Sequence, residues 1–196
     1  APGTGILYDL GAHIIDQALY LFGIPKYIFA DVRMQRPHAS ADDYFLVMLD
    51  HGFTQVSLKA GMLVREPGPR YMLHGTLGSF IKYGTDPQEV FLRDGKLPTE
   101  VKNWGIEKEE FYGLLHTEIN GTVVKEKYPS LPGNYGSYYE NLYKTIRENS
   151  PLRERPEHGH NSVRLIELAF ESSQQKKVLP CTGLIDVGYP EMKSTN

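Results

Sequence analysis

The chain has 196 residues, of which 40% are hydrophobic and 23% charged, and its formal net charge is −3. These are the proportions of an ordinary globular protein that can bury a core without disulfides, and the single cysteine excludes a disulfide framework within the chain. No cluster of Lys or Arg and no apolar stretch of about 20 residues is present, so we expect neither nucleic-acid binding nor a membrane span. The lone cysteine fits a reducing compartment, and we expect a cytoplasmic protein.

The first predicted element is a helix over residues 10–22, a segment that is apolar over most of its surface. Asp9 stands where an N-cap residue accepts the first backbone N–H groups, and Gly23 with Pro25 stands where a helix ends. A helix with so much apolar surface is largely buried.

The hydrophobic pattern then changes from the period of a helix to the period of strands. Between residues 44 and 49 both alternating sets are apolar, which predicts a strand covered on both sides. Within 53–64 apolar and polar side chains alternate, which predicts a strand with one buried face. The connection at 76–78 predicts a hairpin. The predicted strands are 27–35, 44–50, 53–64, 70–75 and 79–83.

Residues 84–133 carry many Gly, Pro and charged residues, and we expect an elaborated loop region with a strand or two, of which only 123–128 is located. Two helices, 135–149 and 159–177, follow, and the second has a broad apolar stripe. The stripe comprises Val163, Ile166, Leu168, Ala169 and Phe170.

The order of a helix, antiparallel strands and then helices predicts an α+β fold, with a mainly antiparallel open β-sheet and helices packed on one face. We expect residues 1–196 to form a single domain. A doubly wound fold is not expected, because no G-x-G-x-x-G follows a strand and the chain therefore has no dinucleotide fingerprint of its own.

One narrow polar stripe interrupts the apolar surface of the first helix, and it faces a cavity, an interface or solvent. Four side chains fall within an arc of roughly 60° on this stripe. They are Asp9, His13, Asp16 and Tyr20. Asp9 and His13 are one turn apart, so the carboxylate can hydrogen-bond to the imidazole or relay a proton with it.

His13 suits acid–base chemistry, because histidine is the side chain whose unperturbed pKa lies nearest neutrality. In the first turn of the predicted helix, the positive end of the dipole favours the neutral ring. A neutral imidazole beside a carboxylate can take the proton of a hydroxyl, which the oxidation of an alcohol requires. A plainer interpretation is that Asp9 is only an N-cap and His13 is structural. Asp16 and Tyr20 would then simply be exposed.

Metal binding is a weaker alternative for the same residues, and we expect no metal site. Asp9 and His13 are spaced to hold a metal at i and i+4, but no third ligand is evident. His158 and His160 resemble a metal-binding fragment without a further Cys or His at ligand spacing, and we expect them to begin the last helix. Cys181 has no obvious base to activate it as a nucleophile.

The segment from Gly5 to Asp16, together with Leu21–Pro25, resembles the opening of the C-terminal domain of the Gfo/Idh/MocA oxidoreductases. The family pattern there is G-x-[LI]-x-D-x-G-x-H-x-x-D, followed by a helix and an F-G-x-P turn. Arg70–Phe80 is similar to a two-strand segment of the family. Lys82–Glu89 and Leu131–Tyr135 are similar to one bacterial and fungal subgroup, so the resemblance extends over nearly the whole chain.

The resemblance implies a two-domain enzyme, in which an N-terminal Rossmann domain that is absent from this chain binds NAD or NADP. It also implies that the open sheet face joins subunits into homodimers or tetramers. For the site, it implies that Asp9 is the orienting or proton-relay carboxylate and His13 the general acid/base. Asp16 matches a position that binds substrate or is structural, and Tyr20, on the same stripe, is a further candidate to bind substrate. In inositol-dehydrogenase-like members a lysine of the absent domain completes the site.

We therefore expect the parent protein to move a hydride between C4 of a nicotinamide and a hydroxyl-bearing carbon of a sugar, polyol or related small molecule. The isolated chain is expected to be inactive, because the cofactor must be positioned against the substrate. Two alternatives stay open. One is a non-catalytic dimerisation or ligand-sensing module derived from this fold, and the other is a reductase acting on an imine or another C=X bond.

Overall fold

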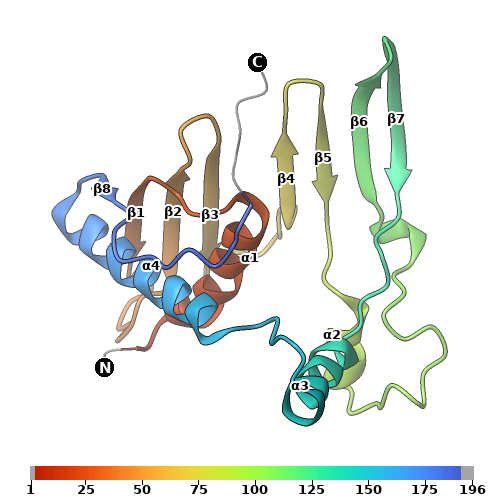
Figure 1. Ribbon diagram of the computed structural model, residues 1–196. Helices are drawn as coiled ribbons and strands as arrows, with labels where there is room; N and C mark the ends of the chain where they lie inside the picture. Colours follow the sequence, from red (N-terminus) through yellow and green to blue (C-terminus); the bar gives the residue numbers. More distant parts are fainter. Residues whose placement is uncertain (1–2, 191–196) are drawn as a thin grey trace. The chain divides into compact units, whose positions relative to one another are not determined.

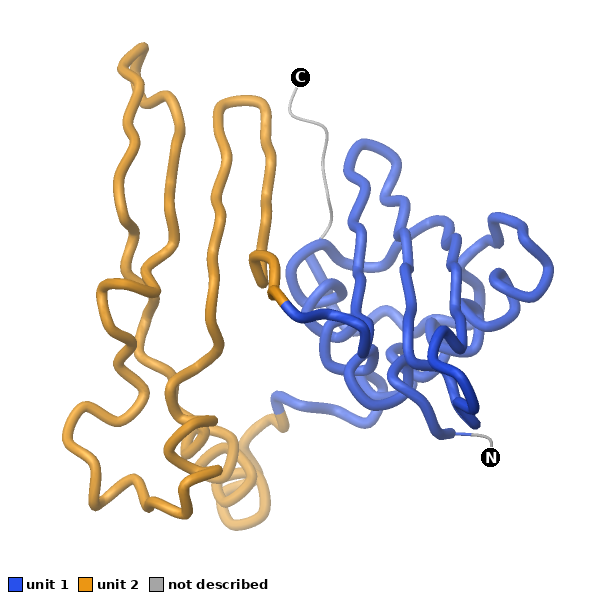
Figure 2. The backbone as a smooth tube through the Cα atoms, turned by 180° about the vertical axis from the view of Figure 1, so that it is seen from behind, with its two compact units in different colours: residues 1–65, 153–196 blue, residues 66–152 orange. Residues whose placement is uncertain are grey.

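The computed structural model describes residues 3–190, which divide into two compact units. Unit 1 comprises residues 1–65 and 153–196, and unit 2 comprises residues 66–152 (Figure 2). Each unit contains an antiparallel four-stranded sheet, whose strands are labelled in Figure 1. The combination of antiparallel sheets and helices confirms the predicted α+β fold. Within residues 3–190, no helix has both the length and the apolar character needed to cross a membrane.

Unit 1 begins with a helix in two parts, η1 (Leu7–Gly11), which is wound as a π-helix, and α1 (Ala12–Phe22). Gly11 and Ala12 at the junction both have right-handed helical backbone angles, so the two parts continue as one helix, which we call the site helix. The helix ends as predicted at Gly23, whose φ of 78° lies in the region that favours glycine.

The site helix begins earlier than the sequence predicts, and two expectations are wrong in consequence. Asp9 is not the N-cap, because it lies inside η1; the carboxylate that accepts a hydrogen bond at the helix start is Asp42, 2.8 Å from the Leu7 N–H. His13 therefore lies in the second turn and not the first, where the positive end of the helix dipole acts on it less strongly. A contact between residues so far apart in the chain leaves no local pattern.

The unit 1 sheet has the strand order β3-β2-β1-β8, with all neighbours antiparallel. Its strands are β1 (Tyr27–Arg33), β2 (Tyr44–Asp50), β3 (Gln55–Gly61) and β8 (Leu179–Pro180). Alternate residues of β2 from Phe45 to Leu49 are fully buried and those between them half-buried, so the strand is covered on both sides. β1 and β3 are shorter than predicted, because Gln35 and Met62 just beyond them donate their N–H groups to Asp43.

Helix α4 (Pro156–Gln175) lies across the unit 1 sheet beside α1 (Figure 1). It begins before residue 159, because Pro156 occupies the first turn and His158 Nδ1 accepts the Arg155 N–H at 3.4 Å. The prediction that Val163 belongs to the buried apolar stripe is wrong, since this residue is 46% exposed. The core lies between the helices and the sheet, and its fully buried side chains include Ile15, Leu19, Ile28, Phe45, Leu165 and Ile166.

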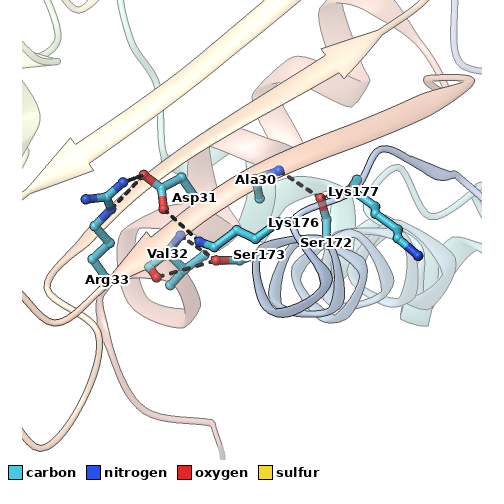
Figure 3. A network of polar contacts seen from close by, with 8 residues as sticks. All are labelled: Ala30, Asp31, Val32, Arg33, Ser172, Ser173, Lys176 and Lys177. Atoms are coloured by element: carbon cyan, nitrogen blue, oxygen red, sulfur yellow. Dashed lines mark hydrogen bonds and ion pairs between the residues drawn. The ribbon is translucent and has the colours of Figure 1, made fainter.

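The C-terminal end of α4 completes one edge of the unit 1 sheet. β8 pairs only with the first two residues of β1, so later N–H groups of β1 need other partners. Ser172 Oγ accepts the Ala30 N–H at 3.0 Å, and Ser173 Oγ accepts the Val32 N–H at 2.9 Å (Figure 3). These serines cover an edge that would otherwise be open to pairing with another chain.

Unit 2 contains the second sheet, in the order β4-β5-β6-β7. Its strands are β4 (Tyr71–His74), β5 (Gly78–Lys82), β6 (Gly113–Ile119) and β7 (Thr122–Tyr128). Its helices are α2 (Pro87–Arg93), η2 (Glu109–Phe111) and α3 (Gly136–Glu148). The strands predicted at 70–75, 79–83 and 123–128 and the helix predicted at 135–149 are confirmed, whereas α2 and β6 lie in the segment predicted as loop.

One buried side chain organises this loop segment. The Gln88 amide oxygen accepts the Trp104 Nε1–H at 2.8 Å and the Tyr135 N–H at 3.0 Å. The start of α2 has a local signal, because Asp86 accepts the Gln88 N–H at 2.9 Å and Pro87 occupies the first helical position. The contacts of Gln88 with distant residues have no such signal, and they hold the segment together.

Candidate active site

Asp9 lies in η1, the π-helical turn at the start of the site helix. Its side chain is exposed, and its N–H donates to the Gly5 carbonyl at 3.1 Å. Within residues 3–190 no hydrogen bond or ion pair engages its carboxylate. π-Helical turns are rare and often occur at functional sites. The fold therefore presents at this turn a carboxylate that is open to a ligand.

Asp9 lines an open hollow of about 300 Å³ in unit 1, between the start of the site helix and the loop that joins β1 to β2. This volume is at the lower end of the range for small-molecule sites. Its charged residues are Asp9, Arg36 and Asp42. The rest of the lining is Gly5, Ile6, Ala39, Ser40, Ala41 and Met62.

The loop that forms one wall of the hollow is held by Asp43, whose side chain is buried. Its carboxylate accepts the N–H groups of Gln35 at 2.6 Å and Arg36 at 3.0 Å, and the Arg36 Nε–H at 2.9 Å. The bond from the Gln35 backbone, assisted by those from Arg36, lowers the pKa of Asp43 below its ordinary value although burial opposes it. Asp43 thereby fixes Arg36 at the edge of the hollow.

Asp42, in the same loop, and Gly5 join the loop to the start of the site helix. The Asp42 carboxylate accepts the Leu7 N–H at 2.8 Å, and its carbonyl accepts the Ile6 N–H at 2.9 Å. Gly5 has a φ of +102°, and a Cβ at this position would overlap the Asp42 carboxylate. Only glycine permits both this backbone conformation and this close approach.

His13 lies one turn beyond Asp9 on the same helix, and its side chain is also exposed. Within residues 3–190 no hydrogen bond joins the two side chains, and His13 is not among the residues that line the hollow. His13 acts instead on Asp16: a positive charge on the His13 imidazole lowers the pKa of Asp16. Neither Asp9 nor His13 is sealed in the core, so both can meet a ligand.

Asp16 is half-buried and belongs to a cluster of ionisable groups at the start of α4. Burial raises the pKa of Asp16, and the negative charge of Glu154 adds to this effect. His158 and His13 oppose it. Tyr20, the last residue of the predicted stripe, is 74% exposed, and its contact with a substrate stays a prediction.

Sequence reasoning missed the residues that build the site around the helix. Arg36, Asp42 and Asp43 shape the hollow, and Glu154 and His158 surround Asp16. The pair of aspartates directly before an apolar strand was the one local signal, because aspartates often accept backbone hydrogen bonds at such turns. Nothing in the spacing indicates that one of them meets the start of the site helix.

The described residues suit contact with a substrate better than contact with a whole cofactor. Within residues 3–190, no three His, Cys, Asp or Glu side chains are arranged to hold a metal ion. The two sheets are antiparallel, so the described chain has no parallel βαβ unit of the kind that binds a dinucleotide pyrophosphate. Burial raises the pKa of the Cys181 thiol to about 12, which leaves it unsuited to act as a nucleophile.

Comparison with known proteins identifies the family of this chain. Residues 1–181 match the family described as "Oxidoreductase family, C-terminal alpha/beta domain". The chain belongs to the Gfo/Idh/MocA oxidoreductases and corresponds to their C-terminal domain. The family predicted from the motif at Gly5–Asp16 is thereby confirmed.

Two curated relatives show the extent of the similarity. The chain is 49% identical over 177 residues to scyllo-inositol 2-dehydrogenase (NADP(+)) IolW of Bacillus subtilis, covering 90% of this chain and 49% of that protein. It is 37% identical over 180 residues to the uncharacterized oxidoreductase YdgJ of Escherichia coli, covering 91% of this chain and 51% of that protein. The chain thus spans about half the length of the curated relatives it matches.

Solved structures of oxidoreductases have the same fold as this chain. The oxidoreductase yvaA of Bacillus subtilis superposes with a TM-score of 0.87 at 46% identity, covering 92% of this chain and 52% of that one. An oxidoreductase of Bacteroides fragilis superposes with a TM-score of 0.84 at 45% identity, covering 90% and 53%. These similarities support an oxidoreductase as the parent protein.

Proposed function

We propose that the parent protein is a nicotinamide-dependent dehydrogenase and that this chain supplies its proton-transfer and substrate-binding residues. The observation that carries the proposal is the exposed Asp9 carboxylate, on a π-helical turn beside a hollow, with the exposed His13 one turn further along. The family is one of oxidoreductases, and the Bacillus subtilis relative is named as an NADP(+)-dependent dehydrogenase.

The proton is the part of the reaction that this chain handles. When an alcohol is oxidised, a hydride leaves carbon and a proton leaves oxygen; the nicotinamide, when bound, supplies the hydride acceptor. His13 accepts the hydroxyl proton on its imidazole and returns it in the reverse direction. Asp9 orients that ring or exchanges a proton with it, because side-chain rotation can bring two exposed residues one turn apart into contact. Asp16 and Tyr20 bind other hydroxyls of the substrate.

The substrate class we propose is a sugar, a polyol or a related hydroxy compound. The hollow beside Asp9 offers carboxylate oxygens, the Arg36 guanidinium and the Ser40 hydroxyl, which together can accept from and donate to several hydroxyls. The name of the Bacillus subtilis relative, a scyllo-inositol 2-dehydrogenase, supports the same class.

The rest of the parent protein is part of the proposal. Because the chain spans about half of its relatives, we propose that an N-terminal Rossmann domain binds NAD or NADP and that residues 1–196 form the C-terminal domain. We also propose that the protein is cytoplasmic and forms homodimers or tetramers through a sheet face.

The direct test is to supply the full-length parent with NADP⁺ or NAD⁺ and a panel that includes scyllo-inositol, other polyols and sugars. Reduction of the nicotinamide with at least one of them is the expected result, followed as absorbance at the nicotinamide band. The isolated chain, assayed in parallel, should give no turnover.

Failure has two distinguishable forms. If the parent binds a polyol but oxidises none, the non-catalytic sensing module is the better account. If instead the isolated chain turns over robustly, the division of labour between two domains is wrong.

A further inference from the structure

The segment Thr182–Pro190 lies beyond the residues that match the family, yet it is fixed to the first half of α4. Arg164 Nε donates to the Thr182 carbonyl at 3.1 Å, and His160 Nε2 lies 3.0 Å from the Gly183 carbonyl. We call Thr182–Pro190 the C-terminal segment. Side chains of the helix hold its backbone, so its path depends on α4 and not on a strand.

The strongest attachment of the C-terminal segment is at Ile185. The Asn161 side chain is fully buried; its amide nitrogen donates to the Ile185 carbonyl and its amide oxygen accepts the Ile185 N–H, both at 2.8 Å. Arg155 adds a bond from Nη2 to the Val187 carbonyl at 2.7 Å. A buried amide that satisfies both backbone groups of one residue fixes the segment at that point.

The end of the segment meets the site helix. A Cβ on Gly23, at the end of α1, would overlap the Pro190 carbonyl oxygen, so the two backbones are in close contact. The Tyr189 ring packs against His158, with ring centroids 5.6 Å apart and an interplanar angle of 38°. Tyr189 also packs against the core, and its hydroxyl oxygen is enclosed without a hydrogen bond of good geometry to any described residue.

Tyr189 and Asp16 lie in one polar cluster. Burial raises the pKa of Tyr189, and the negative charges of Asp16 and Glu154 add to the effect, against Asn161 and Arg155. His158, whose ring packs against Tyr189, lowers the pKa of Asp16 when it is positively charged. The charges that act on Asp16 are those of His13 on its own helix and of Glu154 and His158 at the start of α4; Tyr189, whose ring packs against His158, is affected in turn by the charge of Asp16.

We propose that the C-terminal segment is a positioning element of the candidate active site: fixed to α4 by Asn161, it holds the Tyr189 ring against His158 and shields Asp16 from water. Tyr189 is then a positioning residue for Asp16. The effect of Tyr189 on catalysis rests on the proposed function, in which Asp16 binds substrate. The effect of Tyr189 on the titration of Asp16 is independent of the proposed function.

The first test measures the titration of the Asp16 carboxyl carbon by NMR in the chain of 196 residues. Tyr189→Ala removes the ring, so the pKa of Asp16 should fall toward its ordinary value. The matched control is Tyr189→Phe, which keeps the ring and removes only the hydroxyl, so the pKa of Asp16 should stay raised.

Two results would overturn the proposal: an unchanged titration in Tyr189→Ala, or an equal fall in both variants. A chain that ends at Cys181 is the second variant and should show the same fall as Tyr189→Ala. Its amide spectrum shows whether unit 1 has kept its fold.

The second test measures steady-state kinetics of the full-length parent with its polyol substrate. Tyr189→Ala should raise KM about two- to tenfold, the effect of losing about one hydrogen bond to substrate, with kcat nearly unchanged. Tyr189→Phe should behave as the wild type. If the titration changes and KM does not, Asp16 does not bind substrate. If the wild type oxidises polyols and the titration is unchanged, the positioning role fails and the proposed function stands.

Discussion

At the scale of single residues, the start of the site helix depends on the pair Gly5 and Asp42. Asp42 accepts the first N–H group of the helix, and Gly5 leaves room for that carboxylate while holding a φ of +102°. The hollow beside Asp9 is built on the same two residues. A change at Gly5 therefore acts on helix, hollow and candidate catalytic carboxylate together.

Gly5→Ala should destabilise unit 1 by about 1–3 kcal/mol, because it adds a Cβ where Asp42 lies and strains a positive φ. Gly3→Ala is the matched control, since Gly3 also has a positive φ, of +79°, but nothing lies within 4 Å of its Cβ position. Urea unfolding of the two variants checks this. Equal losses of stability would mean that backbone strain alone, and not the contact with Asp42, sets the cost.

Asp16→Asn should stabilise the folded chain at neutral pH by about 0.5 kcal/mol, a small effect because the side chain is only half-buried. The pKa of Asp16 is raised in the folded state, so folding favours the protonated form, and stability falls as pH rises above the ordinary value of 3.8. The variant should show a smaller loss over that range in urea titrations at several pH values. A variant less stable than wild type at pH 7 would contradict this sign.

Single residues also show how far the sequence can be interpreted. Asp9 and His13 could be chosen from the sequence, because one helix and its period place them. Arg36 and Tyr189 could not, since they reach the site through a loop and a C-terminal segment whose paths are set by the buried side chains Asp43 and Asn161. Asp43 bonds residues seven and eight positions away across its loop, and Asn161 bonds a residue 24 positions away.

At the scale of elements, the junction of α4 and β1 shows how side chains replace a missing strand. Ser172 Oγ accepts the Ala30 N–H in a buried hydrogen bond (Figure 3), and it donates to the carbonyl of the exposed Lys177 at 2.6 Å. Ser173 Oγ likewise accepts the Val32 N–H. The helix is thereby tied to the sheet by hydrogen bonds in addition to its apolar face.

Ser172→Ala should lower the free energy of unfolding by about 1–3 kcal/mol, because it leaves a buried N–H and a carbonyl without partners. Ser137→Ala is a suitable comparison. The Ser137 hydroxyl donates to the Asn134 carbonyl at the exposed start of α3, so its loss should lower the free energy of unfolding by less than about 0.5 kcal/mol. Thermal or urea unfolding measures both. Indistinguishable values for the two serines would remove Ser172 from the account of the sheet edge.

Elements were predictable where local pattern decided them. In unit 1, β2 follows from its continuous apolar run, β3 from alternating apolar residues, and the end of α1 from Gly23. α2 and β6 were missed because distant partners stabilise them: Gln88 binds Trp104 and Tyr135, and β6 pairs with β5 and β7. The π-helical turn at Asp9 has no known local signal in this chain.

At the scale of the whole molecule, the division into two units was not expected from the sequence, because it depends on which distant segments contact each other. Unit 2 places apolar residues in a row across neighbouring strands: Met72 pairs with Ile81 and Ile81 with Leu114. Met72 is 59% exposed, and Val123 on the same sheet 66%. We propose this face for the homodimer or tetramer contact.

Leu114→Lys should weaken self-association of the parent protein about tenfold or more, because it places a charge within an apolar contact. Leu97→Lys provides the control, as Leu97 is 57% exposed but lies outside the sheet. Sedimentation velocity over a range of concentrations measures the self-association of both variants. A parent that is monomeric throughout, or a Leu114→Lys variant that assembles normally, would exclude this face.

The central claim is that His13 exchanges the proton of the reacting hydroxyl. The measurement that tests it most directly is kcat of the full-length parent carrying His13→Ala, beside Gln174→Ala at an exposed position of α4. The account predicts a loss of about 10²–10⁴-fold for His13→Ala, the usual contribution of a general base, and none for the control. A His13→Ala enzyme within a few-fold of wild type would contradict it and leave His13 a structural residue.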